Sequence, residues 1–405
     1  MTKDEIINAA FKVWGCNYYR KTSLSQLAGE LKVSKPALYR HFINKQDLSA
    51  AMTERFLNEF AVSIKDDLKK AKEMEPDEGI LTIIGSISRY FGQNVFALIF
   101  SIMSFYDRNV DKSFISQQLK ERGADMAVLQ EIILKKYPAE TSIIRLIFNS
   151  LTFFMSAFHK KNNSMKNPPS QEDIEKVNIT ICGIIKHGLG FFDQKSKNKA
   201  TLDFEKLEKF VSEMTLNAQA EPFFKAVAEA VAEAGPWDVS MDMVAKKIGM
   251  SKSSLYGHFK SRKDMLRRLF ITEFKRIIEF AKQGIALSSD PAEQLYLGLF
   301  SISVYLQERQ EILIAMDWIR TRKLNLGKPD KNIELFRLFE DVEIAQLRNA
   351  SDEEKQRASH WFLFLLINIL THPMEVQMNS EDKNVNYNIE TLYKFITLGL
   401  GGFVQ

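Results

Sequence analysis

The strongest constraint on the fold of this chain is that its sequence repeats itself. Residues 22–48 align without a gap to residues 239–265, and nine of these 27 positions are identical. A second match lies near the end of each half, where residues 185–192 resemble residues 396–403. The repeating unit is roughly 190 residues long, far beyond the period of a solenoid. We infer that a complete unit has been duplicated in tandem within the 405-residue chain.

Apolar residues recur with helical rather than strand periodicity. They follow the i, i+3, i+4, i+7 spacing of a core-facing helix, and no convincing alternating strand is present. The stripe comprises Ile7, Ala10, Phe11 and Trp14 in the first copy and Phe224, Val227, Ala228 and Val231 in the second. We therefore predict an all-α fold, with helix breaks near the proline-containing segments 75–77, 137–138, 167–169, 288–291, 326–329 and 372–373.

The matched segments have the spacing of a helix-turn-helix. Ser23 and Ser240 are predicted to cap a short first helix, and Ser34 and Ser251 open the second helix, the candidate reader of a major groove. The turn contains Gly249 in the second copy, which tolerates a left-handed backbone. Lys32 stands there in the first copy, so we expect a strained or differently shaped turn.

The second helix of each motif has one apolar and one polar face. Leu38 and Phe42, and likewise Leu255 and Phe259, are four residues apart and should point inward. The other positions are mainly polar or basic. Gly257 stands opposite Arg40 and should weaken its helix by about 1 kcal/mol relative to alanine.

The pattern S-K-x-x-L-Y-x-H-F, followed by a basic residue and Asp, resembles the TetR family of bacterial transcriptional regulators. The resemblance implies an all-α unit with an N-terminal three-helix DNA-binding module and a larger helical domain for ligand binding and dimerisation. It implies phosphate contacts by Tyr39, His41, Lys45, Tyr256, His258 and Arg262. It also implies that base edges are approached by Ser34, Lys35, Pro36, Ala37 and Arg40, and by Ser251, Lys252, Ser253, Ser254 and Gly257. The capping residues Ser23 and Ser240 complete the expected DNA-binding residues.

The resemblance also suggests how the chain is divided. We predict module 1 (residues 1–50), effector domain 1 (51–192), a linker with one short helix (193–220), module 2 (221–267) and effector domain 2 (268–405). Members of the family pair their last two long helices in a homodimer. Here those helices would be 140–161 with 171–192, and 352–377 with 387–403. Fusion makes this pairing intramolecular, so we expect a monomer with internal pseudo-two-fold symmetry.

Charge supports the same division. Residues 1–60 and 221–280 each carry a formal charge of +3, which leaves −2 for the rest of a chain of net charge +4. Two basic modules on a slightly acidic body are typical of proteins that bind double-stranded DNA.

The large helical domains are rich in phenylalanine, which favours an apolar cavity and a small apolar ligand, although most of these aromatic residues are expected in the core. Candidate pocket residues are Phe100, Phe105, Phe148, Phe154, Trp318 and Trp361. No phosphate-binding glycine loop, nucleophile elbow or catalytic carboxylate pair is present, so we expect no enzyme and no cofactor. His41 and His258 lack neighbours at metal-ligand spacing, so no metal site is expected.

The cysteines, the N-terminal residues and the apolar runs indicate the cellular compartment that we expect. Two cysteines without a CxxC pair suit a reducing compartment, and the acidic N-terminus does not resemble a signal peptide. The longest uncharged apolar run, residues 361–370, is too short to span a membrane. We therefore expect a cytoplasmic DNA-binding regulator, either a ligand-relieved repressor or an activator. The alternative is a ligand-binding or scaffold protein whose modules no longer bind DNA.

Overall fold

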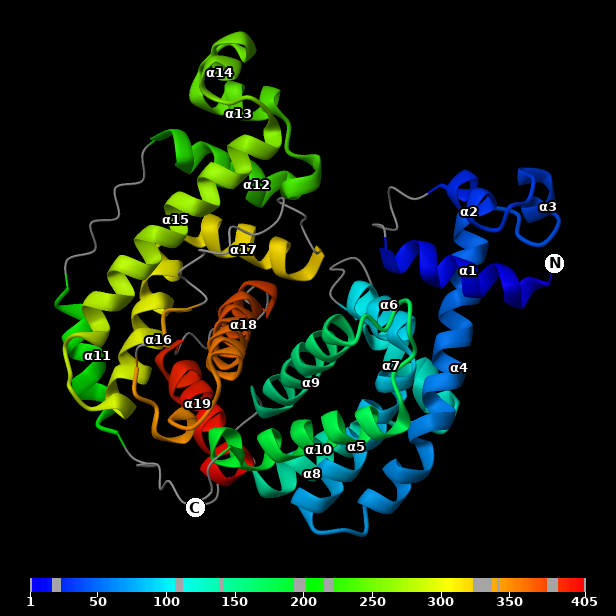
Figure 1. Ribbon diagram of the computed structural model, residues 1–405, viewed down its shortest axis with the longest axis horizontal. Coiled ribbons are helices and arrows are strands. Elements are labelled where there is room, and N and C mark those ends of the chain that lie inside the picture. The colour runs from blue at the N-terminus through cyan, green and yellow to red at the C-terminus, as the bar shows by residue number, and fades with distance from the viewer. Residues whose placement is uncertain are drawn as a thin grey trace. The chain divides into compact units, whose positions relative to one another are not determined.

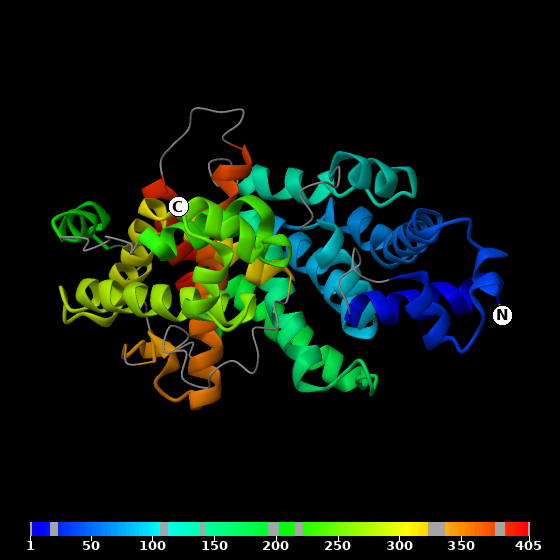
Figure 2. The same cartoon turned by 90° about the horizontal axis from the view of Figure 1, so that it is seen from above.

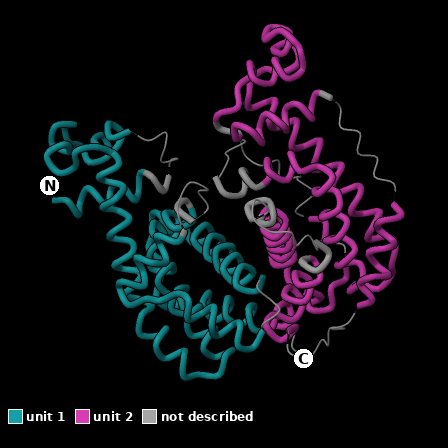
Figure 3. Tube along the Cα trace, turned by 180° about the vertical axis from the view of Figure 1, so that it is seen from behind, with its two compact units in different colours: residues 1–186 teal, residues 187–405 magenta. Residues whose placement is uncertain are grey.

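In the computed structural model, the described residues are 2–16, 23–105, 112–137, 142–192, 202–214, 222–322, 337–340, 342–376 and 385–403. Every regular element within these ranges is a helix, which confirms the all-α prediction (Figures 1 and 2). The chain divides into two compact units, Met1–Lys186 and His187–Gln405 (Figure 3).

The first unit begins with three helices of module 1 and continues through a long helix into effector domain 1. The long helix, α4, packs along α5, which in turn contacts α8 and α9, while α6 packs on α1. The helices are α1 (Lys3–Cys16), α2 (Leu24–Glu30), α3 (Lys35–Tyr39), α4 (Lys45–Ala71), α5 (Pro76–Gln93), α6 (Val95–Phe105), α7 (Lys112–Glu121), α8 (Ala127–Lys136), α9 (Ser142–Lys161) and α10 (Gln171–His187).

The second unit repeats this plan, with α15 packed along α16 and α17 packed on α12. A helix from the linker, α11, packs against α16. The elements are η2 (Gly188–Phe191), α11 (Phe204–Ser212), α12 (Pro222–Asp238), α13 (Met241–Ile248), α14 (Lys252–His258), α15 (Arg262–Ile285), α16 (Pro291–Glu308), α17 (Gln310–Arg322), η4 (Ala345–Leu347), α18 (Asp352–Val376), α19 (Val385–Leu398) and η5 (Gly399–Phe403).

Most of the predicted proline breaks coincide with helix ends, and α18 ends at Val376, one residue before the end of the predicted helix 352–377. α5 and α16 begin at Pro76 and Pro291, where a missing N–H costs nothing. By contrast, α18 continues through Pro373 to Val376. Pro373 lies in the last turns of this 25-residue helix, where it removes a single backbone hydrogen bond. The segment 326–329 lies outside the described residues.

The short element η2 packs on α19 and η5 within the second unit. Gly188 has a φ of +55°, and a Cβ atom on it would lie 2.5 Å from the carbonyl oxygen of Ile396 and 2.7 Å from the amide of Gly399. Gly399 also has a positive φ, of 61°. Gly188 and Gly399 are equivalent positions of the repeat, so two copies of the same sequence segment meet backbone to backbone.

Among the described residues, one helix is long and apolar enough to cross a membrane. This helix is α9, and half of its most apolar stretch is buried inside the protein.

Candidate nucleic-acid interface

Each module is organised around a small apolar core. In module 1 the core joins α1, α2, α3 and the start of α4. The two predicted inward anchors of α3, Leu38 and Phe42, are buried, as are Leu255 and Phe259 of module 2. This confirms the predicted inner face of both second helices, and it leaves the opposite face of each helix at the surface.

Serine side chains cap the short helices. The Ser23 hydroxyl accepts a hydrogen bond from the Gln26 amide, while the Gln26 side chain accepts one from the Ser23 amide, which completes a capping box. Ser240 and Ser251 accept from the amides of Met243 and Ser254. Ser34 makes no such bond. In α3, Pro36 instead removes one orphan N–H from the first turn.

The turn between the two helices has a left-handed residue in both modules. Gly249 has a φ of 73° and Lys32 a φ of 53°. The predicted strain at Lys32 is therefore present, because a side chain in this region costs about 1–2 kcal/mol. The backbone of module 1 keeps the same turn as module 2 despite the unfavourable residue.

The outer face of the second helix carries most of the residues expected to meet DNA. Tyr39 and Tyr256 are 52% and 50% exposed, a high value for tyrosine. Ala37, His41, Lys45, Ser240 and Arg262 are half-buried, and the other expected contact residues are exposed: Ser23, Ser34, Lys35, Pro36, Arg40, Ser251, Lys252, Ser253, Ser254, Gly257 and His258. The two outer faces differ in length as well as in chemistry. α3 ends at Tyr39, whereas α14 continues through Gly257 to His258.

Two aspartates that we did not single out as site residues organise the loop between the second helix and the next. The Asp47 carboxylate accepts from the amide of Ile43, and its own amide donates to Asn44. Asp264 makes the same pair of bonds with Lys260 and Ser261. Both aspartates are identical positions of the repeat, and a capping residue three positions earlier was the signal that could have identified them.

The basic residues that begin α4 and α15, Lys45 and Arg262, are partly withdrawn from solvent. Burial lowers the pKa of Lys45. In module 2, one terminal nitrogen of Arg262 donates to the carbonyl of Val239 at 3.5 Å. Nearby, the guanidinium of Arg268 lies 5.4 Å from the centre of the Phe259 ring. In module 2 these contacts hold cationic side chains at the edge of the module, where phosphate contacts are expected.

The connection between module and effector domain differs between the copies. In copy 1 it is aromatic, because Phe100 of α6 lies 5.2 Å from Phe11 of α1 and 5.6 Å from Phe56 of α4. In copy 2, Glu273 stands at the position of Phe56 and is fully buried. Glu273 accepts from Tyr305 at 2.8 Å and is paired with Arg309 at 3.4 Å. Burial, with a contribution from Glu273, raises the pKa of Tyr305.

The six aromatic residues proposed for a ligand pocket occupy packed positions where they are described. Phe100 packs against the module 1 core, Trp361 and Phe154 are buried, and Phe148 is half-buried. Trp361 packs on Phe362 and Phe395. The side chains of Phe105 and Trp318 lie outside the described residues. The role of all six aromatic residues in a ligand pocket remains a prediction.

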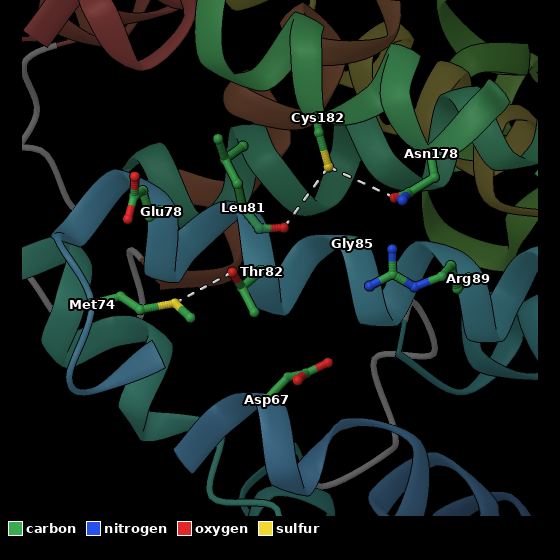
Figure 4. Close-up of a pocket in the computed structure, with 9 residues that line it drawn as sticks. All are labelled: Asp67, Met74, Glu78, Leu81, Thr82, Gly85, Arg89, Asn178 and Cys182. Carbon is green, nitrogen blue, oxygen red and sulfur yellow. Dashed lines mark hydrogen bonds between the residues drawn. The ribbon is translucent and has the colours of Figure 1, made fainter. Parts of the chain in front are cut away.

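An open cavity of about 490 Å³ lies on effector domain 1, between α4, α5 and α10 (Figure 4). It is lined by Asp67, Met74, Glu78, Leu81, Thr82, Gly85, Arg89, Asn178 and Cys182, none of which we had proposed. Burial raises the pKa of Cys182 to about 11, so its thiol is neutral, and its single S–H has two acceptors within reach, the Leu81 carbonyl at 3.8 Å and the Asn178 Oδ1 at 3.7 Å.

The geometry of the two modules defines the class of protein. Each has a helix-turn-helix packed on a preceding helix, with the polar face of its second helix exposed, as in DNA-binding proteins of the helix-turn-helix class. A family model for bacterial regulatory proteins of the tetR family matches residues 6–52 and 224–269, which are the two modules. The chain belongs to the TetR family and is a DNA-binding transcription regulator with two tandem copies of the module.

Solved structures that align with part of this chain include the fatty acid degradation regulator FadR from Bacillus halodurans, at 14% identity and a TM-score of 0.34. They also include the TetR family transcriptional regulator PfmR from Thermus thermophilus, at 18% identity and a TM-score of 0.32. Each alignment covers 44% of this chain and 97% of the other. A search of curated proteins found no match.

Proposed function

We propose that the chain is a cytoplasmic, ligand-relieved repressor that binds one asymmetric operator as a single-chain pseudo-dimer. The observation that carries this proposal is the presence of two complete modules whose exposed faces differ. Module 1 presents Lys35-Pro36-Ala37 and Arg40, whereas module 2 presents Lys252-Ser253-Ser254 and Gly257. A homodimer presents one helix twice and requires a palindrome, whereas this chain presents two different helices.

The contact between Gly188 and Gly399 supports intramolecular pairing. In a pair of units related by a two-fold axis, residues close to the axis meet their own equivalents. Gly188 and Gly399 are equivalent in the repeat, and a Cβ atom on Gly188 would lie 2.7 Å from the amide of Gly399. A short linker holds the two halves at an effective concentration in the mM range. Pairing of this kind would set the two second helices about 34–36 Å apart, in successive major grooves.

Relief by a ligand is supported by how the effector domains touch the modules. In the first unit α6 packs on α1, and in the second unit α17 packs on α12. A ligand that shifts α6 or α17 would change the tilt of the attached module. It relieves repression only if it binds the state that does not bind DNA more tightly.

Selection of bound DNA from a random pool tests the operator. We expect an asymmetric site with two unlike halves and binding that weakens steeply with salt. A perfect palindrome would contradict the asymmetric reading. Failure to bind any duplex at low salt would instead favour a ligand-binding or scaffold protein.

Sedimentation at low protein concentration tests the pseudo-dimer. A monomer of 46.6 kDa is expected, both free and with one operator duplex bound. An obligate dimer of chains would overturn the intramolecular pairing.

A further inference from the structure

The two effector domains can be compared residue by residue at the face where the cavity lies. Residues 76–94 of copy 1 align with residues 291–309 of copy 2, and six of the 19 positions are identical, including Ser86 with Ser301 and Tyr90 with Tyr305. α10 aligns with α19 through the glycine-containing ends of the copies. The residues that line the cavity in copy 1 therefore have defined counterparts in copy 2.

In copy 2 this face is filled and covered by the linker helix α11. The ring of Phe204 lies 4.8 Å from that of Tyr296 and 5.9 Å from that of Tyr393. One turn further along α11, Glu208 accepts a hydrogen bond of 2.6 Å from the Tyr296 hydroxyl. Leu207 and Val211 of α11 are also buried. The linker thus presents an aromatic ring and a carboxylate to α16 and α19.

In copy 1 the rings that fill this face are missing. Leu81 stands where Tyr296 does, Cys182 where Tyr393 does, and Gly85 where Phe300 does. Part of the space that those side chains fill in copy 2 corresponds to the cavity of about 490 Å³ in copy 1 (Figure 4). Above Gly85, the Arg89 guanidinium and the Asn178 side chain each lie 3.5 Å from where a Cβ atom would be. That volume lies within the range of small-molecule sites.

The packing of the two helices at the base of this face, α4 and α5 in copy 1 and α15 and α16 in copy 2, also differs between the copies. Asp67 of α4 has Gly284 as its counterpart, and a Cβ atom on Gly284 would lie 2.0 Å from the Ser301 hydroxyl. The α15 and α16 backbones of copy 2 are therefore in close contact where copy 1 has a carboxylate between α4 and α5. Asp67 accepts a hydrogen bond from Ser86 and pairs with Lys70 at 3.1 Å.

Copy 1 also has a cation that copy 2 lacks, because Arg89 stands in the place of Val304. Its ion-pair partner is Glu175 at 3.8 Å, beyond hydrogen-bond distance, and both side chains are more than 40% exposed. Two acidic residues also line the cavity. The charge of Asp67 is offset by Lys70. Glu78 has Glu293 as its counterpart, and α11 packs on copy 2 although Glu293 is present there. Arg89 is thus the group in the lining that suits an incoming carboxylate, which a guanidinium can bind with two parallel hydrogen bonds.

We propose that the cavity of effector domain 1 binds a small aromatic carboxylate. The ring lies over Leu81 and Cys182, in the space that tyrosine rings fill in copy 2, and the carboxylate pairs with the Arg89 guanidinium, which lies beside Gly85. In copy 2 the linker covers the corresponding face from within the chain, with Phe204 against Tyr296 and Tyr393 and with Glu208 on the Tyr296 hydroxyl. Copy 1 is therefore the copy that senses an external ligand, while the corresponding face of copy 2 is permanently occupied. The regulatory part of this inference rests on the proposed function.

Calorimetric titration of the full chain with 3-phenylpropionate tests the site. We expect one molecule bound per chain, and at least tenfold weaker binding of the uncharged 3-phenylpropan-1-ol. Arg89→Gln should weaken 3-phenylpropionate binding at least tenfold, whereas Arg55→Gln, which removes an arginine of α4 outside the cavity, should not change it. No binding at mM concentration, or unchanged binding in Arg89→Gln, would overturn the proposal.

Two further measurements distinguish a small-molecule site from a site that receives a helix. The double variant Leu81→Tyr/Cys182→Tyr restores the rings of copy 2 and should abolish binding. A peptide of residues 202–214 that binds the chain in an Arg89-dependent manner while 3-phenylpropionate does not would show that the cavity receives a helix, and would overturn the small-molecule assignment.

Operator affinity measured on the same samples separates this inference from the proposed function. Probe binding that weakens operator binding supports both. Probe binding without any change in operator affinity supports the site and overturns its sensing role. Probe binding by a chain that binds no duplex supports the site and contradicts the proposed function.

Discussion

The hydroxyl of Tyr305 donates a hydrogen bond of 2.8 Å to the carboxylate of Glu273, and both side chains are buried. Copy 1 keeps the tyrosine, as Tyr90, but has Phe56 in place of the glutamate. Among the described residues, the Tyr90 hydroxyl has no hydrogen-bond partner, although it is buried. The equivalent crossing of helices thus holds a polar network in copy 2 and an aromatic cluster in copy 1, and Arg309 of the network also has a different counterpart, Asn94.

The matched variants Tyr305→Phe and Tyr90→Phe should have opposite effects on stability. Tyr305→Phe removes a hydrogen bond to a buried charge, so we expect a loss of about 1.5–3 kcal/mol. Tyr90→Phe removes a hydroxyl that is desolvated without compensation, so it should be neutral or stabilise the chain by up to about 1–3 kcal/mol. Urea unfolding of the two variants beside the parent measures both changes. Equal losses in the two variants would contradict the asymmetry.

Local signals in the sequence account for what could be predicted. The apolar stripes, the caps at Ser23, Ser240 and Ser251 and the left-handed turn at Gly249 depend on residues within a few positions of one another. The structure bears them out except at Trp14, whose side chain lies outside the described residues. Lys32 shows how strong these local requirements are, because it adopts the same left-handed backbone as Gly249. The repeat itself identified which residues of the two copies should be compared.

Tertiary contacts account for what could not be predicted. Glu273 lies in a helix rich in charge, and its burial depends on Tyr305 and Arg309, which are more than 30 positions away. The cavity beside Arg89 exists because small residues from two helices face each other, which no periodicity reveals. The aromatic residues chosen as ligand contacts were selected by type alone, and those described are packed against other side chains.

The turn of module 1 can be tested by exchanging its residue. Lys32→Gly should stabilise the chain by about 0.5–1 kcal/mol, because relief of the left-handed strain outweighs the greater backbone freedom of glycine in the unfolded chain. Lys32→Ala is the control, since it removes the charge and keeps the strain, and it should bring no gain. The reverse change, Gly249→Ala, should destabilise the chain by about 1 kcal/mol or more. Thermal unfolding of the three variants ranks them.

The ion pair of Asp67 predicts a dependence of stability on pH. The hydrogen bond from Ser86, and then Lys70, holds the pKa of Asp67 below its usual value of 3.8. A carboxylate with a lowered folded-state pKa stabilises the protein above its unfolded-state pKa, and the stabilisation disappears as the pH falls through the folded-state pKa. Asp67→Asn should therefore be less stable than the parent at neutral pH, and the difference should shrink below about pH 4. A difference that grows on acidification would show that the pKa is raised instead.

Asp47 and Asp264 should be required for the loop that precedes α4 and α15. Asp47→Ala removes the acceptor of the Ile43 amide, and the loss of such a cap costs about 0.5–2 kcal/mol. Asp47→Asn keeps an oxygen acceptor and serves as the control, with a smaller loss expected. Because Ile43, which is 81% exposed, lies in the same loop, Asp47→Ala should also weaken operator binding. If Asp47→Ala loses about 0.5–2 kcal/mol of stability, as expected, but binds the operator as tightly as the parent, this loop lies outside the DNA interface.

The asymmetric operator makes its sharpest prediction at Arg40, which has Gly257 as its counterpart. An arginine that binds guanine through two hydrogen bonds contributes about 1–3 kcal/mol of discrimination, so Arg40→Ala should weaken operator binding by that amount. The loss of sequence preference should be confined to one half of the selected site, because module 2 has no side chain at this position. Lys69→Ala, which removes one charge at the far end of α4, should leave the selected sequence unchanged. Relaxed selection in both halves after Arg40→Ala would mean that both modules read the same sequence, and the single-chain asymmetric operator would have to be abandoned.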